Sequence, residues 1–142
     1  MSVVPRAFLR ELYDTAVAAV APDVCVPPHL PSPRRGRTLV VGAGKGAAAM
    51  ARAVEDRWPN EINGLVVTRY GHGVACRRIE VVEAGHPFPD AAGQEAARRI
   101  YALAESAGPD DLVLCLLSGG GSASWRPSSP IRRERRRARL PA

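Results

Sequence analysis

The sequence predicts an α/β fold of the Rossmann-like type, with a mainly parallel sheet and flanking helices. Four short aliphatic or β-branched runs are nearly continuous, which is typical of strands that are covered on both faces. These runs lie at residues 38–41, 64–68, 79–83 and 112–117. A helical pattern separates the first two runs and another separates the last two. Because neighbouring parallel strands must be joined by a crossover connection, which is usually a helix, this order of strands and helices favours a parallel sheet.

The first predicted helix covers residues 5–21, where Pro5 suits the first helical turn. Its apolar residues recur at helical spacing, and we expect this face to pack in the core. They are Phe8, Leu9, Leu12, Ala16, Val17 and Val20. Residues 22–37 contain five prolines and three arginines and are predicted to be a connector.

Two further helices are predicted at residues 45–57 and 90–106. The first of them ends before Pro59, which cannot continue a helix. The second begins at Asp90, which is expected to be a helix cap rather than a catalyst. Its apolar face comprises Ala96, Ala97, Ile100, Leu103 and Ala104. Both helices therefore have an apolar side for a sheet.

Composition and charge describe one ordinary globular domain. The chain has 142 residues, of which 46% are hydrophobic and only 5% aromatic, so the core must consist mainly of Ala, Val and Leu. The net charge of +6 comes from residues 125–142, since residues 1–124 hold 13 basic and 13 acidic side chains. This neutral body predicts no nucleic-acid partner.

The cysteines and the N-terminus indicate a soluble cytoplasmic protein. Cys25, Cys76 and Cys115 are far apart and form no CxxC pair, which argues against a disulfide framework or a zinc site and fits a reducing compartment. Charged residues interrupt the N-terminal apolar residues where a signal peptide needs its apolar core. No apolar run approaches the ~18–20 residues that span a bilayer, so no membrane partner is expected.

A Gly-rich loop follows the first apolar run and contains Gly42, Gly44, Lys45 and Gly46. Ligands of parallel sheets bind at the carboxyl ends of the strands. Glycines let backbone N–H groups approach a ligand, and the following helix N-terminus adds positive potential. The loop therefore predicts an anion site. Lys45 is the only lysine in the chain, and its charge suits a carboxylate or a phosphoryl group in transfer.

The spelling of this loop also matches G-x-G-x-x-A, a dinucleotide-binding fingerprint. NAD-binding proteins add an acid about 20 residues later, at the end of the second strand. Here that strand ends in Thr68 and Arg69, and Arg69 suits the 2′-phosphate of NADP instead. A P-loop is disfavoured, because Gly46 follows Lys45 where Ser or Thr is required.

A second Gly-rich loop follows the most apolar run. Two hydroxyls flank three glycines in the order Ser118, Gly119, Gly120, Gly121 and Ser122. Successive backbone N–H groups in such a loop form an anion nest, although Gly/Ser runs also serve as linkers. Its position directly after a strand favours a binding loop.

Two histidines follow the second and third strand-like runs. His72 lies in "TRYGHG" and His86 in "EAGHPFPD". Both are candidates for substrate contacts or acid–base chemistry, and neither has a partner that the sequence identifies.

Four motifs in order resemble the N-terminal region of the type-2 glycerate kinases, which are often labelled hydroxypyruvate reductases. They are "VVGAGKGAAAMARAVE", "GLVVTRYGHG", "VVEAGHPFPDAAGQEAARRI" and "DLVLCLLSGGGSA". The resemblance implies ATP-dependent phosphorylation of D-glycerate to 2-phosphoglycerate, with Mg²⁺, on a Rossmann-like large domain facing a second domain. It also implies that Lys45 is the catalytic lysine and that residues 118–122 bind substrate or nucleotide. It assigns neither metal ligands nor an oligomeric state.

The resemblance covers residues 5–123, whereas family members run to about 400 residues, far beyond one domain. We expect 1–123 to be the N-terminal part of a truncated Rossmann-like domain. Residues 124–142 read as a disordered Arg/Pro-rich tail that is out of frame. The sequence downstream of residue 123 in the gene tests this, since a frameshift requires a kinase-like continuation in another frame. The chain is then an inactive fragment, with its later groups missing and an open sheet edge.

Two other functions stay open at this stage. One is an NAD(P)-binding domain of a hydroxypyruvate reductase-like oxidoreductase. The other is a non-enzymatic nucleic-acid binder that uses the arginines of 125–142, for which deletion of that segment would abolish salt-dependent binding.

Overall fold

The computed structural model describes residues 5–119. Gly120, Gly121 and Ser122 of the second Gly-rich loop, and the predicted tail at 124–142, lie outside this range.

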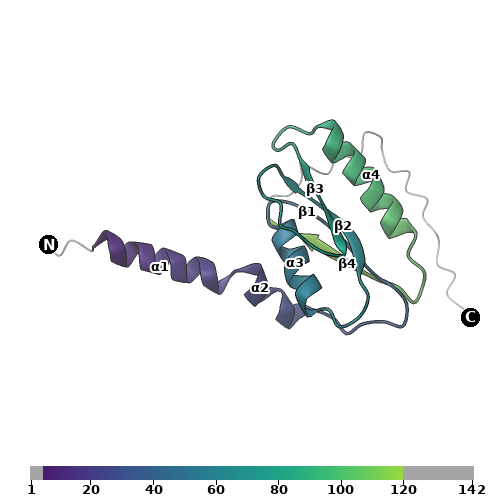
Figure 1. Cartoon of the computed structure of the whole chain (residues 1–142), viewed down its shortest axis with the longest axis horizontal. Helices are drawn as coiled ribbons and strands as arrows, with labels where there is room; N and C mark the ends of the chain where they lie inside the picture. Colours follow the sequence, from purple (N-terminus) through teal and green to yellow (C-terminus); the bar gives the residue numbers. More distant parts are fainter. Residues whose placement is uncertain (1–4, 120–142) are drawn as a thin grey trace, which may run out of the picture.

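A four-stranded parallel sheet forms the centre of the molecule (Figure 1). Its strands lie in the order β3-β2-β1-β4 and all neighbours are parallel. Their bounds are β1 (Thr38–Ala43), β2 (Asn63–Arg69), β3 (Ile79–Ala84) and β4 (Leu112–Leu117). The predicted α/β fold with a parallel sheet is therefore confirmed, and each predicted run lies within an observed strand.

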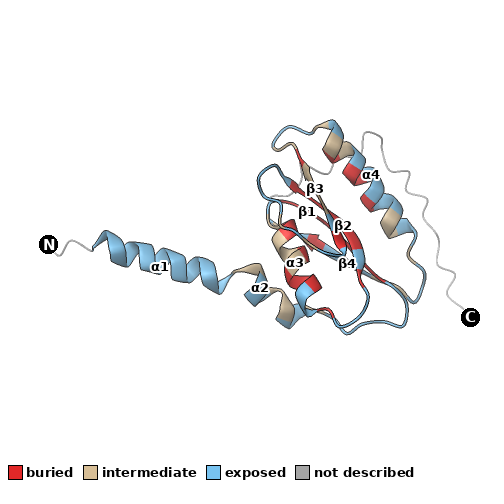
Figure 2. Ribbon diagram, in the orientation of Figure 1, coloured by how far each residue is buried: buried red, intermediate tan, exposed pale blue. Residues whose placement is uncertain are grey.

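Helices α3 (Ala47–Arg57) and α4 (Ala91–Glu105) cover the two faces of the sheet (Figure 1). One core combines β-sheet residues with the inner side of α3, and its members include Val40, Val66, Leu116, Ala51 and Val54. The other core combines the opposite sheet face with α4, and its members include Val41, Leu65, Val67, Ala96 and Ile100. As the composition predicts, Ala, Val and Leu dominate the buried set. Figure 2 shows that buried residues lie on the strands and on parts of α3 and α4.

Helix α1 (Arg6–Ala19) departs from prediction. It extends away from the sheet beyond α2 (Pro22–Cys25) and the short 3-10 helix η1 (Pro27–His29), as Figures 1 and 2 show. None of its residues is buried. The predicted packing of its apolar face in the core is wrong, because α2 and η1 pack on α3 whereas α1 contacts mainly α2. Periodicity identifies an apolar face but not the surface that covers it.

Among the residues that the structure describes, a helix covers only one face of strand β4. It packs toward α3, while α4 lies over β1, β2 and β3. On the other face Val113 and Leu117 are exposed. Within residues 5–119, β4 pairs only with β1. None of the helices described is long and apolar enough to cross a membrane.

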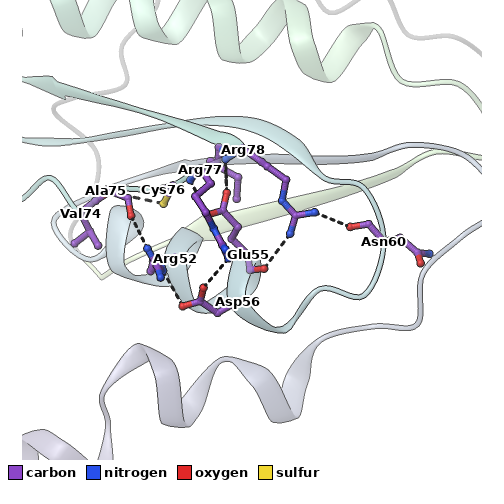
Figure 3. A network of polar contacts seen from close by, with 10 residues as sticks. Arg52, Glu55, Asp56, Asn60, Val74, Ala75, Cys76, Arg77 and Arg78 are labelled. Carbon is purple, nitrogen blue, oxygen red and sulfur yellow. Dashed lines mark hydrogen bonds and ion pairs between the residues drawn. The ribbon is translucent and has the colours of Figure 1, made fainter.

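A buried carboxylate fixes the start of β3 (Figure 3). The side chain of Glu55 on α3 is fully buried and accepts hydrogen bonds from the backbone N–H groups of Arg77, Arg78 and Ile79. Burial alone raises the pKa of Glu55, but these three bonds and the Arg77 charge outweigh it and lower that pKa. These bonds tie the loop before β3 to α3. They also compensate the cost of burying the charged carboxylate of Glu55.

A second set of polar contacts joins the start of β1 to the segment before β4. The Arg37 guanidinium donates to Asp111 and to the carbonyl of Ser106, with distances of 2.7 Å for its Nη2 atom to each. The backbone N–H of Arg37 also donates to Asp111. Arg37, together with the N–H of Gly108, lowers the pKa of Asp111 to about 2.

Candidate functional site

The two Gly-rich loops meet at the carboxyl edge of the sheet, because β1 and β4 are neighbours. The N–H of Gly46 donates to the Ser118 hydroxyl oxygen at 3.1 Å. The N–H of Ser118 donates in turn to the carbonyl of Ala43 at 3.2 Å. The two loops therefore form one structural unit, the lysine cradle, although Gly46 and Ser118 are 72 positions apart in the sequence.

Two of the glycines cannot be replaced without moving this cradle. Gly44 has a φ of +114°, and a Cβ atom there would overlap the Ser118 hydroxyl. A Cβ atom on Gly42 would overlap the carbonyl of Leu116 on β4. Gly46 is less constrained, since its added Cβ would lie 3.3 Å from that of Ser118. The glycines therefore allow the two loops to approach each other closely.

Lys45 lies in the first of these loops and is exposed. Its backbone carbonyl accepts a hydrogen bond from the Thr68 hydroxyl at 3.3 Å, and Thr68 is fully buried at the end of β2. The backbone of the lysine is thus held from β2 while its ammonium group remains in solvent. Sequence reasoning missed Thr68 as a support of the loop. The available signal was a hydroxyl at the end of an otherwise apolar strand.

The N-terminus of α3 adds donors to the same cradle. The helix begins at Ala47, directly after the loop, and has 11 residues. Within the described part of the chain, the N–H groups of Lys45, Ala48 and Ala49 donate to no acceptor. Free N–H groups and the positive end of the helix dipole favour an anion here. The lysine and the helix terminus together suit a phosphate or a carboxylate.

The loops after β2 and β3 are tied to each other beside this cradle. The Tyr70 hydroxyl donates to Asp90 at 2.8 Å, and Asp90 caps α4 by accepting from the N–H of Gly93 at 2.9 Å. The bond from Gly93, followed by those from Tyr70 and Gly85, lowers the pKa of Asp90. The bond to Asp90 raises the pKa of Tyr70. Asp90 is therefore a helix cap, as the sequence predicts.

The histidines lie on this edge, and their side chains form no hydrogen bond with the lysine loop within residues 5–119. His72 is exposed in the turn after β2, the strand that neighbours β1. Its backbone N–H donates to the carbonyl of Arg69 at 3.0 Å. His86 is half-buried after β3, one strand further from β1. Neither side chain forms a hydrogen bond with Lys45 or Ser118 in the described structure. Gly119 follows Ser118 and is exposed.

The described residues contain no group of three or more His, Cys, Asp or Glu side chains that could hold a metal ion. The cradle itself consists of N–H donors, hydroxyls and one ammonium group. This donor set fits phosphate oxygens directly. A metal ion here would be held through ligand oxygens and water.

Comparisons with known proteins identify relatives for most of the chain. The protein family described as a domain of unknown function (DUF4147) matches residues 8–138. A protein of Agrobacterium vitis, provisionally named hydroxypyruvate reductase, is 52% identical over 83% of this chain and 27% of its own length. The D-glycerate 2-kinase of Thermotoga maritima is 39% identical over 80% of this chain and 28% of its own length.

The same architecture occurs in a solved structure. The crystal structure of glycerate kinase from Thermotoga maritima superposes on 87% of this chain with a TM-score of 0.74 and 35% sequence identity. The match covers 31% of that longer chain. The chain thus spans only about a quarter to a third of the length of these relatives.

Proposed function

The chain belongs to the DUF4147 family, and on that premise we propose that it carries the lysine-bearing part of a D-glycerate 2-kinase site. Glycerate kinase and D-glycerate 2-kinase are names of relatives that match most of this chain. The observation that supports the proposal best is the contact between the two Gly-rich loops, in which Gly46, the residue between Lys45 and the start of α3, donates to Ser118.

In the proposed reaction the 2-hydroxyl oxygen of D-glycerate attacks the γ-phosphorus of ATP. The bond from that phosphorus to the β,γ-bridging oxygen breaks, and the products are 2-phosphoglycerate, ADP and the proton of the hydroxyl. Negative charge spreads over the transferring phosphoryl group, where a lysine ammonium group stabilises it. Lys45 takes this catalytic role, and the free N–H donors at the start of α3 orient phosphate oxygens.

The remaining candidates complete the proposed site. Gly42, Gly44 and Gly46 allow the close approach of the phosphates, and Ser118 to Ser122 bind phosphate oxygens or the glycerate carboxylate. His72 and His86, on the adjoining loops, are proposed substrate contacts. Mg²⁺ supplies charge neutralisation for ATP and is bound mainly through the phosphates and water. We propose a cytosolic location, which the three free cysteines support.

We expect the 142-residue chain to bind nucleotide with negligible turnover. The described residues supply one side of the cradle, and phosphoryl transfer needs both reactants to be held in line. Substantial formation of 2-phosphoglycerate from ATP and D-glycerate by this purified chain would contradict that expectation.

A reductase function is the alternative, because Arg69 is exposed at the end of β2 where a 2′-phosphate of NADP would lie. Thermal unfolding with Mg·ATP or with NADPH separates the two proposals. We expect Mg·ATP to raise the unfolding midpoint and Lys45→Gln to weaken apparent ATP affinity about tenfold, by loss of a charge-assisted contact.

Arg69→Gln is the matched control, since it also removes one positive charge from the same edge. It should leave ATP affinity within about twofold, as expected for an exposed charge that forms no ion pair within residues 5–119. If NADPH alone raises the midpoint, and Arg69→Gln rather than Lys45→Gln removes the effect, the kinase proposal is wrong.

A further inference from the structure

A groove opens at the opposite edge of the sheet, where the strands begin. It has a volume of about 610 Å³ and is formed between the end of the connector, the first residues of β1 and β2, and the segment that leads into β2. Four arginines line it, namely Arg34, Arg35, Arg37 and Arg78. Its size is within the range of small-molecule sites. Nothing in the proposed phosphoryl-transfer site uses this edge.

The charges of this groove are unevenly balanced. Arg37 is neutralised by Asp111, with which it forms an ion pair at 2.7 Å. Glu61 is the only acidic residue in the lining. Within residues 5–119 the guanidinium groups of Arg34 and Arg35 form no ion pair. These two arginines and Arg78 carry three positive charges, and Glu61 balances one of them. The groove therefore has an excess of two positive charges, although residues 1–124 as a whole are neutral.

Arg78 is held in place without a carboxylate partner for its guanidinium group. That group donates to the backbone carbonyls of Asn60 and Glu55, at 3.1 Å in each case (Figure 3). Its backbone N–H donates to the buried carboxylate of Glu55. Backbone carbonyls orient the planar guanidinium without cancelling its charge. Two of its five N–H donors form these bonds, and the other three donate to no acceptor within residues 5–119, so they are available for an anion.

Other arginines of the body contrast with those of the groove. Arg52 and Arg77 pair with Asp56, and Arg99 pairs with Glu80. The groove therefore brings together three guanidinium groups that form no ion pair within residues 5–119. Lys45, Arg57 and Arg69 also form no ion pair there, but they do not line the groove. An extended polyanion needs a row of several cations, whereas a compact dianion needs only a few.

We propose that this groove binds the phosphate group of a small phosphorylated molecule, as a site separate from the lysine cradle. Arg78 supplies a fixed donor, and Arg34 and Arg35 close over the dianion from the connector. The amide side chain of Asn63, at the start of β2, adds a polar group for the rest of the ligand. The inference does not depend on the kinase proposal, because the two sites lie at opposite ends of the strands.

The test uses phenyl phosphate as the probe and phenol as its uncharged counterpart. Binding of each is measured by NMR as shifts of the amide signals of the ¹⁵N-labelled full chain. Phenyl phosphate should shift the amide signals of residues 34–37, 60–63 and 78, and phenol should not. The double variant Arg34→Gln/Arg35→Gln should raise the dissociation constant at least about tenfold. Arg78→Gln should weaken binding similarly, and its unchanged spectrum elsewhere would show that it folds.

The matched control is Arg132→Gln/Arg133→Gln, which removes the same charge from an adjacent arginine pair of the C-terminal segment. It should leave the dissociation constant within about twofold. The proposal is overturned if this control weakens binding as much as Arg34→Gln/Arg35→Gln does. Shifts confined to residues 44–47 and 118 would also overturn it, since the probe would then occupy the lysine cradle.

A single-stranded oligonucleotide distinguishes the sources of the phosphate. Binding of the small probe with no preference for the oligonucleotide supports the proposal. If the oligonucleotide binds through residues 34–37 far more tightly, with a steep salt dependence, the groove is a nucleic-acid site and the small-molecule proposal fails.

Discussion

Helices α1 and α4 are similar in length and amphipathic character, yet only α4 is part of the core. Helix α4 has 15 residues and buries Gly93, Ala96, Ala97 and Ile100 against the sheet. Helix α1 has 14 residues and buries none. An isolated helix of this length is marginal in water, because packing rather than propensity supplies most helical stability. The comparison shows that an apolar stripe defines a face, while topology decides whether that face contributes to stability.

The largest expected effect tests this comparison directly. Ile100→Ala removes a side chain that is only 1% exposed, and should lower the free energy of unfolding by about 3 kcal/mol through lost burial and a cavity. Urea denaturation measures it. Leu12→Ala is the counterpart on α1, where Leu12 is 51% exposed, and should cost less than about 0.5 kcal/mol.

A loss above about 1.5 kcal/mol for Leu12→Ala would break the comparison, since it would mean that α1 is packed in solution. Repeating the measurement at several protein concentrations would then show whether a second copy supplies the packing.

Charged residues extend the same contrast. Glu55→Gln on α3 replaces a fully buried carboxylate that accepts three backbone N–H bonds, and should lower stability by about 2 kcal/mol, because an amide N–H₂ then faces those donors. Glu11→Gln on α1 changes an exposed residue and should alter stability by less than about 0.5 kcal/mol. Equal effects in urea denaturation would contradict the structural assignment of Glu55.

Acid titration gives a smaller effect. The pKa of Asp111 is lowered from 3.8 to about 2 in the folded chain, so the stability it contributes is present above about pH 4 and is lost as the pH falls through 2. Urea midpoints for the unmodified chain and Asp111→Asn should therefore differ at pH 5 and converge toward pH 2. A difference between the two urea midpoints that is independent of pH would show that folding does not lower the pKa of Asp111.

The smallest effect is expected when residues 1–20 are removed. Because α1 buries no residue, the unfolding midpoint of the body should change by less than about 2 °C. Circular dichroism would record the melting curve and the loss of one helix. A drop of about 10 °C or more would show that α1 supports the sheet.

The predicted strands and body helices agree with the structure because their signals are local. Continuous apolar runs mark buried parallel strands, and Pro59 and Asp90 mark helix ends. The meeting of Gly44 and Gly46 with Ser118 follows from a general rule, that parallel strands place their carboxyl ends at one edge. Thus the lysine loop and the start of the serine loop could be located from the sequence.

The remaining features depend on contacts that no local pattern encodes. The support from Thr68 and the three bonds to Glu55 join segments more than 20 residues apart. The arginine groove forms where a connector, a loop and two strands meet. For α1 the periodicity correctly predicts a helix, but no sequence pattern indicates which surface, if any, its apolar face packs against.

The neighbouring positions of β1 and β4 set an order of assembly during synthesis. A nascent chain emerging from the ribosome presents β1 first, then β2 and β3, and one edge of β1 stays unpaired until Leu112–Leu117 has been made. Such a long-range pairing is slow to form and leaves an exposed strand edge in the interval. Ser118 follows β4 directly, so the lysine loop acquires its hydroxyl partner only after β4 has been made.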